Sequence, residues 1–252
     1  MIIDTKIKVI IPAYNEEDSI TNVVNDIPNI VDEIIVVSNN STDKTEENAA
    51  KAGATVLREP RRGYGYACLK GMEHIASTSL RQACLPTRQA QSDTLNEPKK
   101  KPDIIVFLDG DYSDYPEQLT DIVTPIIEDN IDFVIGARVK NLRETGSMTP
   151  QQIFGNRLAT FLMRLFFRAK FSDLGPFRAI KYEKLLALNM EDKTYGWTVE
   201  MQLKAIKQKM SYVEVPVKYR NRIGVSKVSG TIKGSILAGV KILGWIFKYS
   251  FK

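Results

Sequence analysis

Two aspartates separated by one glycine, Asp109 and Asp111, follow directly on the apolar run 104–108. In an open α/β sheet, ligands bind beyond the carboxyl ends of the strands, which is where these carboxylates would stand. Carboxylate oxygens suit Mg²⁺ or Mn²⁺, and an ion held by only two of them keeps positions open for phosphate oxygens. The pair therefore predicts a metal site for a diphosphate, with Asp111 as the stronger ligand candidate. Paired acids also cap turns, so the triplet alone leaves a structural role open.

The segments around the pair predict an α/β fold. Strands are expected at 8–12, 34–37, 55–57, 104–108 and 132–136, and helices at 15–27, 41–52, 66–76, 121–130 and 149–169. Apolar strands that alternate with helices are typical of a mainly parallel sheet with helices on both faces and a Rossmann-like nucleotide-binding half. The helix at 149–169 has a broad apolar face. Residues 77–103 are polar and lack periodicity, so we expect a mobile insertion in one domain over 1–230.

Composition is that of an ordinary globular protein, with 43% hydrophobic and 26% charged residues and a formal net charge of +5. Residues 204–252 hold eleven Lys or Arg against the single acid Glu214. This distribution suits phosphates or an anionic membrane surface, and it is also compatible with a solvated basic face. We expect no nucleic-acid partner. Cys68 and Cys84 lack a metal or disulfide spacing, and the start of the chain lacks a signal-peptide pattern, so a cytoplasmic protein is expected.

The last segment, 231–252, predicts an amphipathic helix. Lys233, Lys241, Lys248 and Lys252 fall on one side of a helical wheel. The opposite side carries apolar residues, namely Ile232, Ile236, Val240, Ile242, Leu243, Ile246 and Phe247. This pattern indicates a peripheral helix at the inner face of a membrane, because the lysines interrupt any span. The alternative is a terminal helix that packs on the core through its apolar face.

Further polar segments follow the expected strands. Glu16 could accept hydrogen bonds from paired ribose hydroxyls, although an acid at a helix start is also favoured by the helix dipole. Arg62 and Gly63 precede a helix N-terminus, which favours phosphate, although such turns are also common on plain surfaces. The remaining segments are Ser38-Asn39-Asn40, Gly136-Ala137-Arg138, Asp173-Leu174-Gly175-Pro176-Phe177-Arg178, Gly196-Trp197-Thr198-Val199-Glu200 and Arg220-Asn221-Arg222-Ile223-Gly224-Val225-Ser226-Lys227.

Taken in order, these segments resemble the family 2 glycosyltransferases of the GT-A fold, nearest to the dolichol-phosphate mannosyltransferases and the bacterial polyprenyl-phosphate glycosyltransferases. The resemblance implies a nucleotide-sugar donor, inverting transfer, and Mg²⁺ or Mn²⁺ at Asp109 and Asp111. It implies donor contacts at Pro12, Tyr14, Glu16, Asn39, Arg62, Gly63, Asp109, Arg138, Arg178, Ser226 and Lys227, and catalytic roles for Asp111, Asp173, Glu200 and Arg222. The chain departs from the family at 38–40, where acids and a glycine are usual, and at Pro176, which separates Gly175 from Phe177.

The acceptor decides whether a general base is needed. A hydroxyl acceptor needs one, for which Asp173 and Glu200 are candidates, whereas a phosphate is already an anion near pH 7. Neither acid stands in an unmistakable base motif, which favours a polyprenyl phosphate at a membrane surface. A transferase with a soluble hydroxyl acceptor, a nucleotide-sugar-binding protein and a nucleotidyltransferase remain alternatives. The last usually has a glycine-rich loop after the first strand, where this chain has Pro12 to Glu16.

Overall fold

The computed structural model describes residues 5–83, 102–224 and 232–250, without the side chains of 79–83 and 232–236. In the described residues, seven strands form one sheet in the order β3-β2-β1-β4-β6-β5-β7. They are β1 (Ile7–Ala13), β2 (Glu33–Ser38), β3 (Thr55–Arg58), β4 (Ile104–Phe107), β5 (Phe133–Ala137), β6 (Arg178–Lys181) and β7 (Tyr212–Pro216). Strand β6 is antiparallel to β4 and β5, and the other pairs are parallel. The parallel strands therefore all end at the edge where β6 begins.

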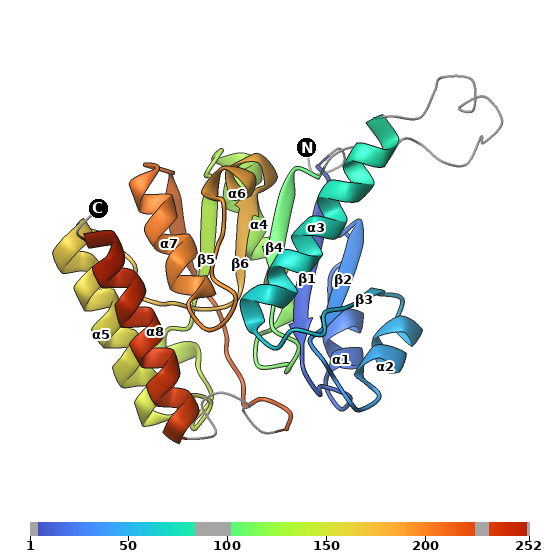
Figure 1. The fold of residues 1–252 in the computed structure, drawn as a ribbon, viewed down its shortest axis with the longest axis horizontal. Helices are drawn as coiled ribbons and strands as arrows, with labels where there is room; N and C mark the ends of the chain where they lie inside the picture. Colours follow the sequence, from blue (N-terminus) through green and yellow to red (C-terminus); the bar gives the residue numbers. More distant parts are fainter. Residues whose placement is uncertain (1–4, 84–101, 225–231, 251–252) are drawn as a thin grey trace.

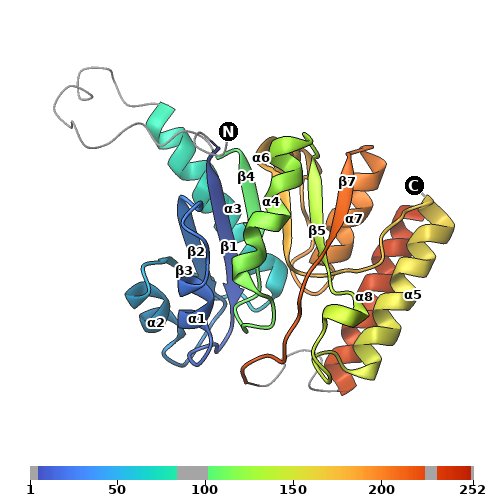
Figure 2. The same ribbon diagram turned by 180° about the vertical axis from the view of Figure 1, so that it is seen from behind.

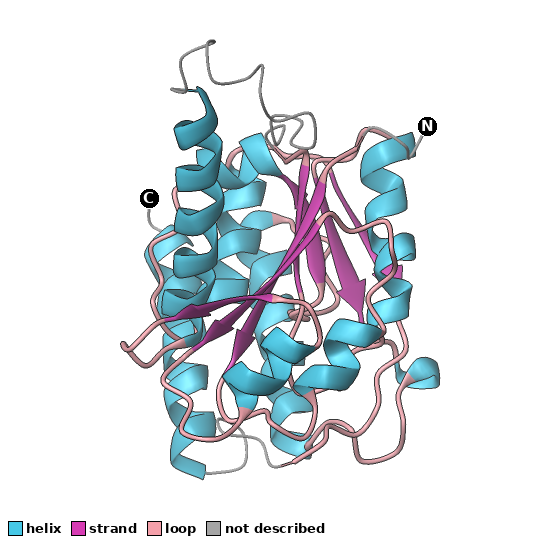
Figure 3. Cartoon of the chain, turned by 90° about the vertical axis from the view of Figure 1, so that its right-hand side faces the viewer, coloured by secondary structure: helices cyan, strands magenta, loops and turns pink. Residues whose placement is uncertain are grey.

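Helices cover both faces of this sheet (Figures 1 and 2). They are α1 (Ile20–Asn25), α2 (Thr45–Lys51), α3 (Tyr64–Ala83), α4 (Leu119–Glu128), α5 (Pro150–Phe167), α6 (Tyr182–Leu188), α7 (Trp197–Lys207) and α8 (Ile232–Ser250), with short 3-10 helices η2 (Pro116–Gln118) and η3 (Lys140–Leu142). Alternating side chains of β1 serve two cores, because successive residues of a strand face opposite sides. Val9 and Ile11 pack with α1, α2 and α4, and Ile10 packs with the helices of the other face. Figure 3 shows the twisted sheet between these layers.

The predicted α/β class and the strands expected before residue 137 are confirmed. Three helices differ from expectation at one end or both. Helix α2 begins at Thr45, later than the expected 41. Helix α1 also begins later than predicted, because backbone amides of 15–17 donate to the side chains of Ser41, Asp43 and Thr45, at and before the start of α2, instead of starting a helix. Helix α3 continues to Ala83, so its last turns lie inside the segment expected as an insertion. The rest of that segment, 84–101, lies outside the described residues.

Helices α5 and α8 lie side by side at one end of the molecule and contact each other, and α8 also contacts α7 (Figures 1 and 2). Trp245 and Ile246 of α8 are buried, so this helix packs on the core as the second interpretation of its sequence proposed. Helix α5 differs from most amphipathic helices, because small or flexible residues, Ala159, Thr160 and Met163, are its buried ones. Four of its larger apolar side chains, Phe154, Phe161, Leu165 and Phe166, are exposed, whereas Leu162 and Phe167 are partly buried against the core. No helix in the described part of the chain is long and apolar enough to cross a membrane.

Candidate active site

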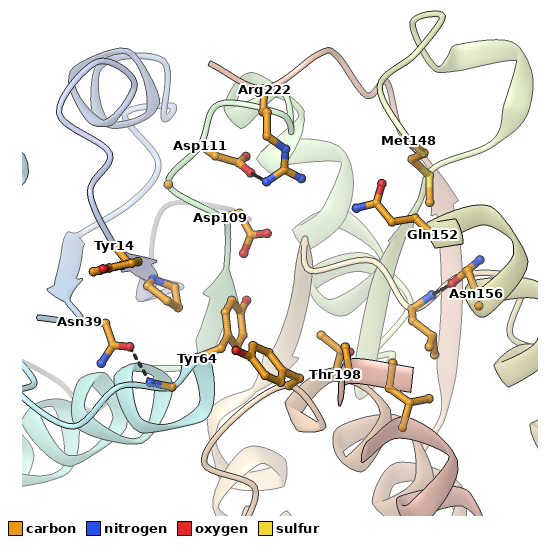
Figure 4. A pocket seen from close by; sticks show the side chains of 18 of the residues that line it. Tyr14, Asn39, Tyr64, Asp109, Asp111, Met148, Gln152, Asn156, Thr198 and Arg222 are labelled. Atoms are coloured by element: carbon orange, nitrogen blue, oxygen red, sulfur yellow. Dashed lines mark hydrogen bonds and ion pairs between the residues drawn. The ribbon is translucent and has the colours of Figure 1, made fainter. Parts of the chain in front are cut away.

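A cavity of about 540 Å³ opens at the edge where the parallel strands end, and α5 and α8 form its far wall. Figure 4 shows side chains from both halves of the sheet converging on it. Ten of the predicted site residues line the cavity, namely Pro12, Tyr14, Glu16, Asn39, Arg62, Gly63, Asp109, Asp111, Arg138 and Arg222. These residues come together because β1, β2, β4 and β5 end at one edge of the sheet.

The two aspartates after β4 have different surroundings. Asp111 is buried, and its Oδ1 accepts hydrogen bonds from the backbone N of Ser113 at 3.0 Å and the Ser113 hydroxyl at 2.6 Å. Its Oδ2 forms an ion pair with Arg222 Nη1 at 2.6 Å. Oδ1 of Asp109 is buried and has no hydrogen-bond partner. Burial, and then the negative charge of Asp111, raises the pKa of Asp109 to about 6.

This arrangement fits a divalent cation. A buried carboxylate oxygen without a partner is unfavourable unless a proton or a cation binds to it. Asp109 Oδ1 is such an oxygen. Asp111 supplies a second carboxylate, which a cation would share with Arg222. No group of three or more His, Cys, Asp or Glu that could hold a metal occurs within the described residues. Diphosphate oxygens and water would therefore complete the coordination, as is usual for Mg²⁺.

Three arginines give the cavity positive charge. Arg138 Nε and Nη2 donate to the two oxygens of Asp173 at 2.8 Å and 2.7 Å. Burial alone would lower the pKa of Arg138, but the Asp173 carboxylate outweighs it and raises this pKa well above its usual value. The pKa of Arg222 is also raised, because the charge of Asp111 outweighs burial. Arg62 lies over the ring of Tyr14, with its Cζ 5.3 Å from the ring centroid. Arg138 and Arg222 are therefore held by carboxylates, and Arg62 lies against the ring of Tyr14 in the same cavity.

Three predicted site residues lie outside the cavity lining. Asp173 is only 4% exposed, and the charge of Arg138 outweighs burial and lowers its pKa, so it is held as a carboxylate that orients Arg138. Glu200 is fully buried and accepts hydrogen bonds from the backbone N of Glu191 and of Asp192. Neither acid lines the cavity, and the base role expected from the sequence stays a prediction that these contacts do not support.

Arg178 is the third of these residues. It begins β6, is fully buried, and donates to the backbone oxygens of Leu174, Gly175 and Thr198. Burial lowers its pKa to about 10. Its guanidinium therefore holds the loop before β6 to the start of α7, and the expected donor contact is not available to it. Ser226 and Lys227, the last two predicted donor contacts, lie outside the described residues.

Asn39 lines the cavity, but its side-chain amide is already engaged. Nδ2 donates to the backbone oxygens of Glu59 at 3.2 Å and Arg61 at 2.7 Å, and Oδ1 accepts from the backbone N of Gly63 at 2.7 Å. The amide therefore shapes the turn before α3. A Cβ at Gly63 would lie 2.1 Å from the backbone oxygen of Lys193, so glycine is required there for close packing.

Sequence reasoning missed the far wall of the cavity. Its residues are neutral, namely Met148, Gln151, Gln152, Gly155, Asn156, Leu174, Tyr195, Thr198, Ala238, Gly239 and Ile242. Asn156 is fixed by hydrogen bonds to the backbone oxygen of Ser172 and from the backbone N of Leu174. One signal was available in the sequence, because Gln151, Gln152 and Asn156 are neutral polar residues in the first turns of a helix with a broad apolar face.

Comparisons with known proteins agree with this architecture. The sequence model of the glycosyl transferase family 2 matches residues 8–78 and 97–186, and the chain belongs to this family. An uncharacterized glycosyltransferase of Mycobacterium bovis is 31% identical over 235 residues, which cover 92% of this chain and 94% of the relative. A dolichyl-phosphate hexose transferase of Haloferax volcanii is 28% identical over 236 residues, covering 91% and 89%.

A further relative is the UDP-N-acetylglucosamine–dolichyl-phosphate N-acetylglucosaminyltransferase of Methanococcus voltae, 28% identical over 237 residues that cover 85% of this chain and 86% of the relative. Among solved structures, glucosyl-3-phosphoglycerate synthase from Mycobacterium tuberculosis, in complex with Mn²⁺, UDP-glucose and phosphoglyceric acid, matches with a TM-score of 0.71 and 19% identity. That match covers 99% of this chain and 81% of the other. The fold is therefore that of GT-A glycosyltransferases, and the chain is a glycosyltransferase that uses a nucleotide sugar.

Proposed function

We propose that this enzyme transfers a sugar, with inversion, from a UDP- or GDP-sugar to the phosphate of a polyprenyl-type lipid at the inner face of a membrane. In this proposal Asp109 and Asp111 bind Mg²⁺ or Mn²⁺. One observation carries it, which is the distribution of charge in the cavity. Among the described lining residues the carboxylates are Glu16, Asp109 and Asp111, and all three follow β1 or β4. The wall formed by α5, α7 and α8 carries no charge in the described residues.

A neutral acceptor wall suits an acceptor that needs no base. An attacking hydroxyl must lose its proton, and efficient transfer requires a carboxylate or imidazole within hydrogen-bond reach. Asp173 is paired with Arg138, Glu200 accepts from two backbone amides, and neither acid lines the cavity. A phosphate is already anionic, and amides such as those of Gln152 and Asn156 could orient it by hydrogen bonds. Two relatives named as dolichyl-phosphate transferases support the same acceptor class.

The arginines would stabilise the charge that develops on the leaving nucleoside diphosphate. Arg138 is held in place by Asp173 before any ligand binds, so little reorganisation is needed during the reaction. Arg222 forms an ion pair with Asp111 and could turn from it toward the diphosphate. A divalent ion at Asp109 and Asp111 would act as a Lewis acid on the same charge. Glu16 lines the cavity, and in this proposal it accepts hydrogen bonds from the ribose of the donor.

The acceptor class can be tested with a matched pair of lipids. Purified protein with Mn²⁺ should form product from UDP-glucose, UDP-GlcNAc or GDP-mannose with a polyprenyl phosphate, and not with the polyprenol of the same chain length. Chelation of the metal should stop the reaction. Asp111→Ala should lower the rate by about 100-fold or more, whereas Asp121→Ala, an exposed acid on α4, should have no effect.

Two results would contradict the proposal. Product from the polyprenol or from a soluble hydroxyl compound, with none from the phosphate, would show that a base operates after all. If Asp111→Ala were fully active in the presence of chelator, neither a metal ion nor Asp111 would be needed for transfer.

A further inference from the structure

Large apolar side chains are concentrated on the outer side of α5 and α8. Seven of the nine large apolar side chains that are exposed in the described residues belong to these two helices. They form what we call the α5–α8 face: Phe154, Phe161, Leu165 and Phe166 of α5 with Leu237, Val240 and Phe247 of α8, each between 43% and 69% exposed. The rings of Phe166 and Phe247, 5.9 Å apart between centroids, join the two helices. The proposed transfer uses none of these side chains.

The α5 part of this face has the charge pattern of an interfacial helix. With about 100° per residue, Phe154, Phe161 and Leu165 fall within an arc of about 40°. Arg157 and Arg164, both exposed, lie about 60° to 80° to one side of Phe154. Neither α5 nor α8 contains an aspartate or glutamate. An exposed apolar stripe bordered by arginines and free of acids is typical of helices that lie in an anionic membrane surface.

The α5–α8 face is continuous with the acceptor wall of the cavity. On α5, Gly155 and Gln152 line the cavity about 100° and 160° around the helix from the exposed Phe154. On α8, Ala238 and Gly239 line the cavity between the exposed Leu237 and Val240. The N-terminal halves of the two helices, which lie side by side in Figures 1 and 2, therefore border both the cavity and the face.

We propose that the α5–α8 face lies in the surface of a membrane that contains anionic lipids, with Phe154, Phe161 and Leu165 of α5 inserted among the lipids. The inference rests on the proposed function for its purpose, since a lipid acceptor could then place its phosphate in the cavity while its chain stays in the bilayer. It extends the membrane contact from the C-terminal helix to α5. A second copy of the chain fits this face less well, because two copies would bring arginines together without any acid to pair with them.

Vesicle sedimentation tests the proposal. The parent protein should sediment with phosphatidylglycerol-containing vesicles and much less with phosphatidylcholine vesicles. The variant Phe161→Ser/Leu165→Ser should partition about tenfold or more weakly into the anionic vesicles. Leu186→Ser is the matched control, because Leu186 is similarly exposed but lies on α6. Because all three side chains are exposed, melting temperatures should be close to that of the parent.

A second variant isolates the charge contribution. Arg157→Gln/Arg164→Gln should reduce the difference between anionic and neutral vesicles and leave binding to neutral vesicles unchanged. Equal sedimentation of the parent and both double variants would overturn the proposal. So would a dimer in sedimentation equilibrium that dissociates in Phe161→Ser/Leu165→Ser, since the face would then join two copies.

A short, water-soluble prenyl phosphate separates this inference from the proposed function. Without vesicles, Phe161→Ser/Leu165→Ser should use this acceptor at the parent's rate, because neither side chain lines the cavity. If the parent protein binds vesicles but forms no product with any lipid phosphate, the proposed function is refuted and the proposed membrane contact stands. If the parent protein forms product but does not bind vesicles, only the proposed membrane contact is refuted.

Discussion

A single methyl group at Gly196 should disturb the attachment of α8 to the rest of the enzyme. Trp245 Nε1 of α8 donates to Asp192 Oδ2 at 2.6 Å, and Lys241 Nζ lies 3.2 Å from the same oxygen. A Cβ on Gly196 would lie 2.4 Å from Trp245 Nε1 and 2.6 Å from Asp192 Oδ2. Gly196 has φ −86° and ψ −4°, which alanine adopts readily, so the effect of Gly196→Ala comes from this contact alone.

The expected magnitude follows from what the methyl group displaces. Overpacking a buried contact costs about 1–3 kcal/mol. If the indole moves away instead, the fully buried Asp192 side chain loses a hydrogen bond to a charged group, which costs about 1.5–3 kcal/mol. In either case the free energy of unfolding of Gly196→Ala should fall by about 2 kcal/mol. For a chain of this size, this lowers the melting temperature by about 4–8 °C.

Thermal unfolding of matched variants measures this effect. Gly244→Ala is the control on α8 itself, since a Cβ there meets nothing within 4 Å. It should stabilise the protein by about 0.5–1 kcal/mol, because alanine favours a helix interior more than glycine does. Trp245→Phe removes the atom nearest to the added methyl group. The double variant Gly196→Ala/Trp245→Phe should therefore be more stable than the sum of the single effects by about 1 kcal/mol.

Gly196→Ala should also affect donor binding. The backbone oxygens of Asp192 and Lys193 pack against Gly65 and Gly63, and the backbone N of Tyr66 donates to Lys193. A displaced loop should therefore raise the KM for the nucleotide sugar more than it lowers kcat. An unchanged melting temperature for Gly196→Ala, with additive effects in the double variant, would refute the reasoning and return α8 to the role of an independent anchor.

Two further predictions concern the acids that the sequence assigned to catalysis. Asp173→Asn should destabilise the protein by about 3–5 kcal/mol at pH 7, because Arg138 loses its buried partner. Since Arg138 lowers the pKa of Asp173, this stabilisation is present above the ordinary aspartate pKa of about 4 and is lost as the pH falls through the lower folded pKa. Melting curves of parent and variant should therefore converge in acid, and a constant gap would contradict the ion pair. Glu200→Gln should lower the melting temperature, because Lys204 Nζ lies 2.8 Å from Glu200 in the parent. The shape of its kcat–pH profile should match that of the parent, and loss of a titration would identify Glu200 as a base.

The donor half of the cavity could be predicted because strand order fixes it. Glu16, Asn39 and Asp111 follow three apolar runs, and parallel strands end at one edge whatever the details of packing. The orientation of a side chain at that edge is a different matter. Asp173 and Arg178 do lie at this edge, but whether a charged group faces a cavity or the interior depends on its partners there. Arg138 holds Asp173, and the backbone oxygens of the preceding loop and of Thr198 on α7 hold Arg178, so both residues are directed inward.

Helix α5 shows a second limit of sequence reasoning. Periodicity gave the helix an apolar face, but a stripe on a helix does not say which neighbour will cover it. The core contact is made by Ala159 and Met163, which allow α5 to approach its neighbours closely. Phe154 and Phe161 are left outside, whereas Phe166 contacts Phe247 of α8 and Phe167 packs against the core. The position of α8 depends on the long-range bond between Trp245 and Asp192.

This position of α8 links the membrane contact to the geometry of the cavity. The helix contributes Ala238 and Gly239 to the acceptor wall and Phe247 to the α5–α8 face. It is held by a hydrogen bond to Asp192, whose loop also packs against the turn at Gly63. A helix bound in this way is not a separable anchor, because moving it changes the acceptor wall and the support of the donor turn together. In the proposed orientation, contact of α8 with a lipid surface would act directly on the element that closes the cavity, so that membrane binding and acceptor binding would depend on the same helix.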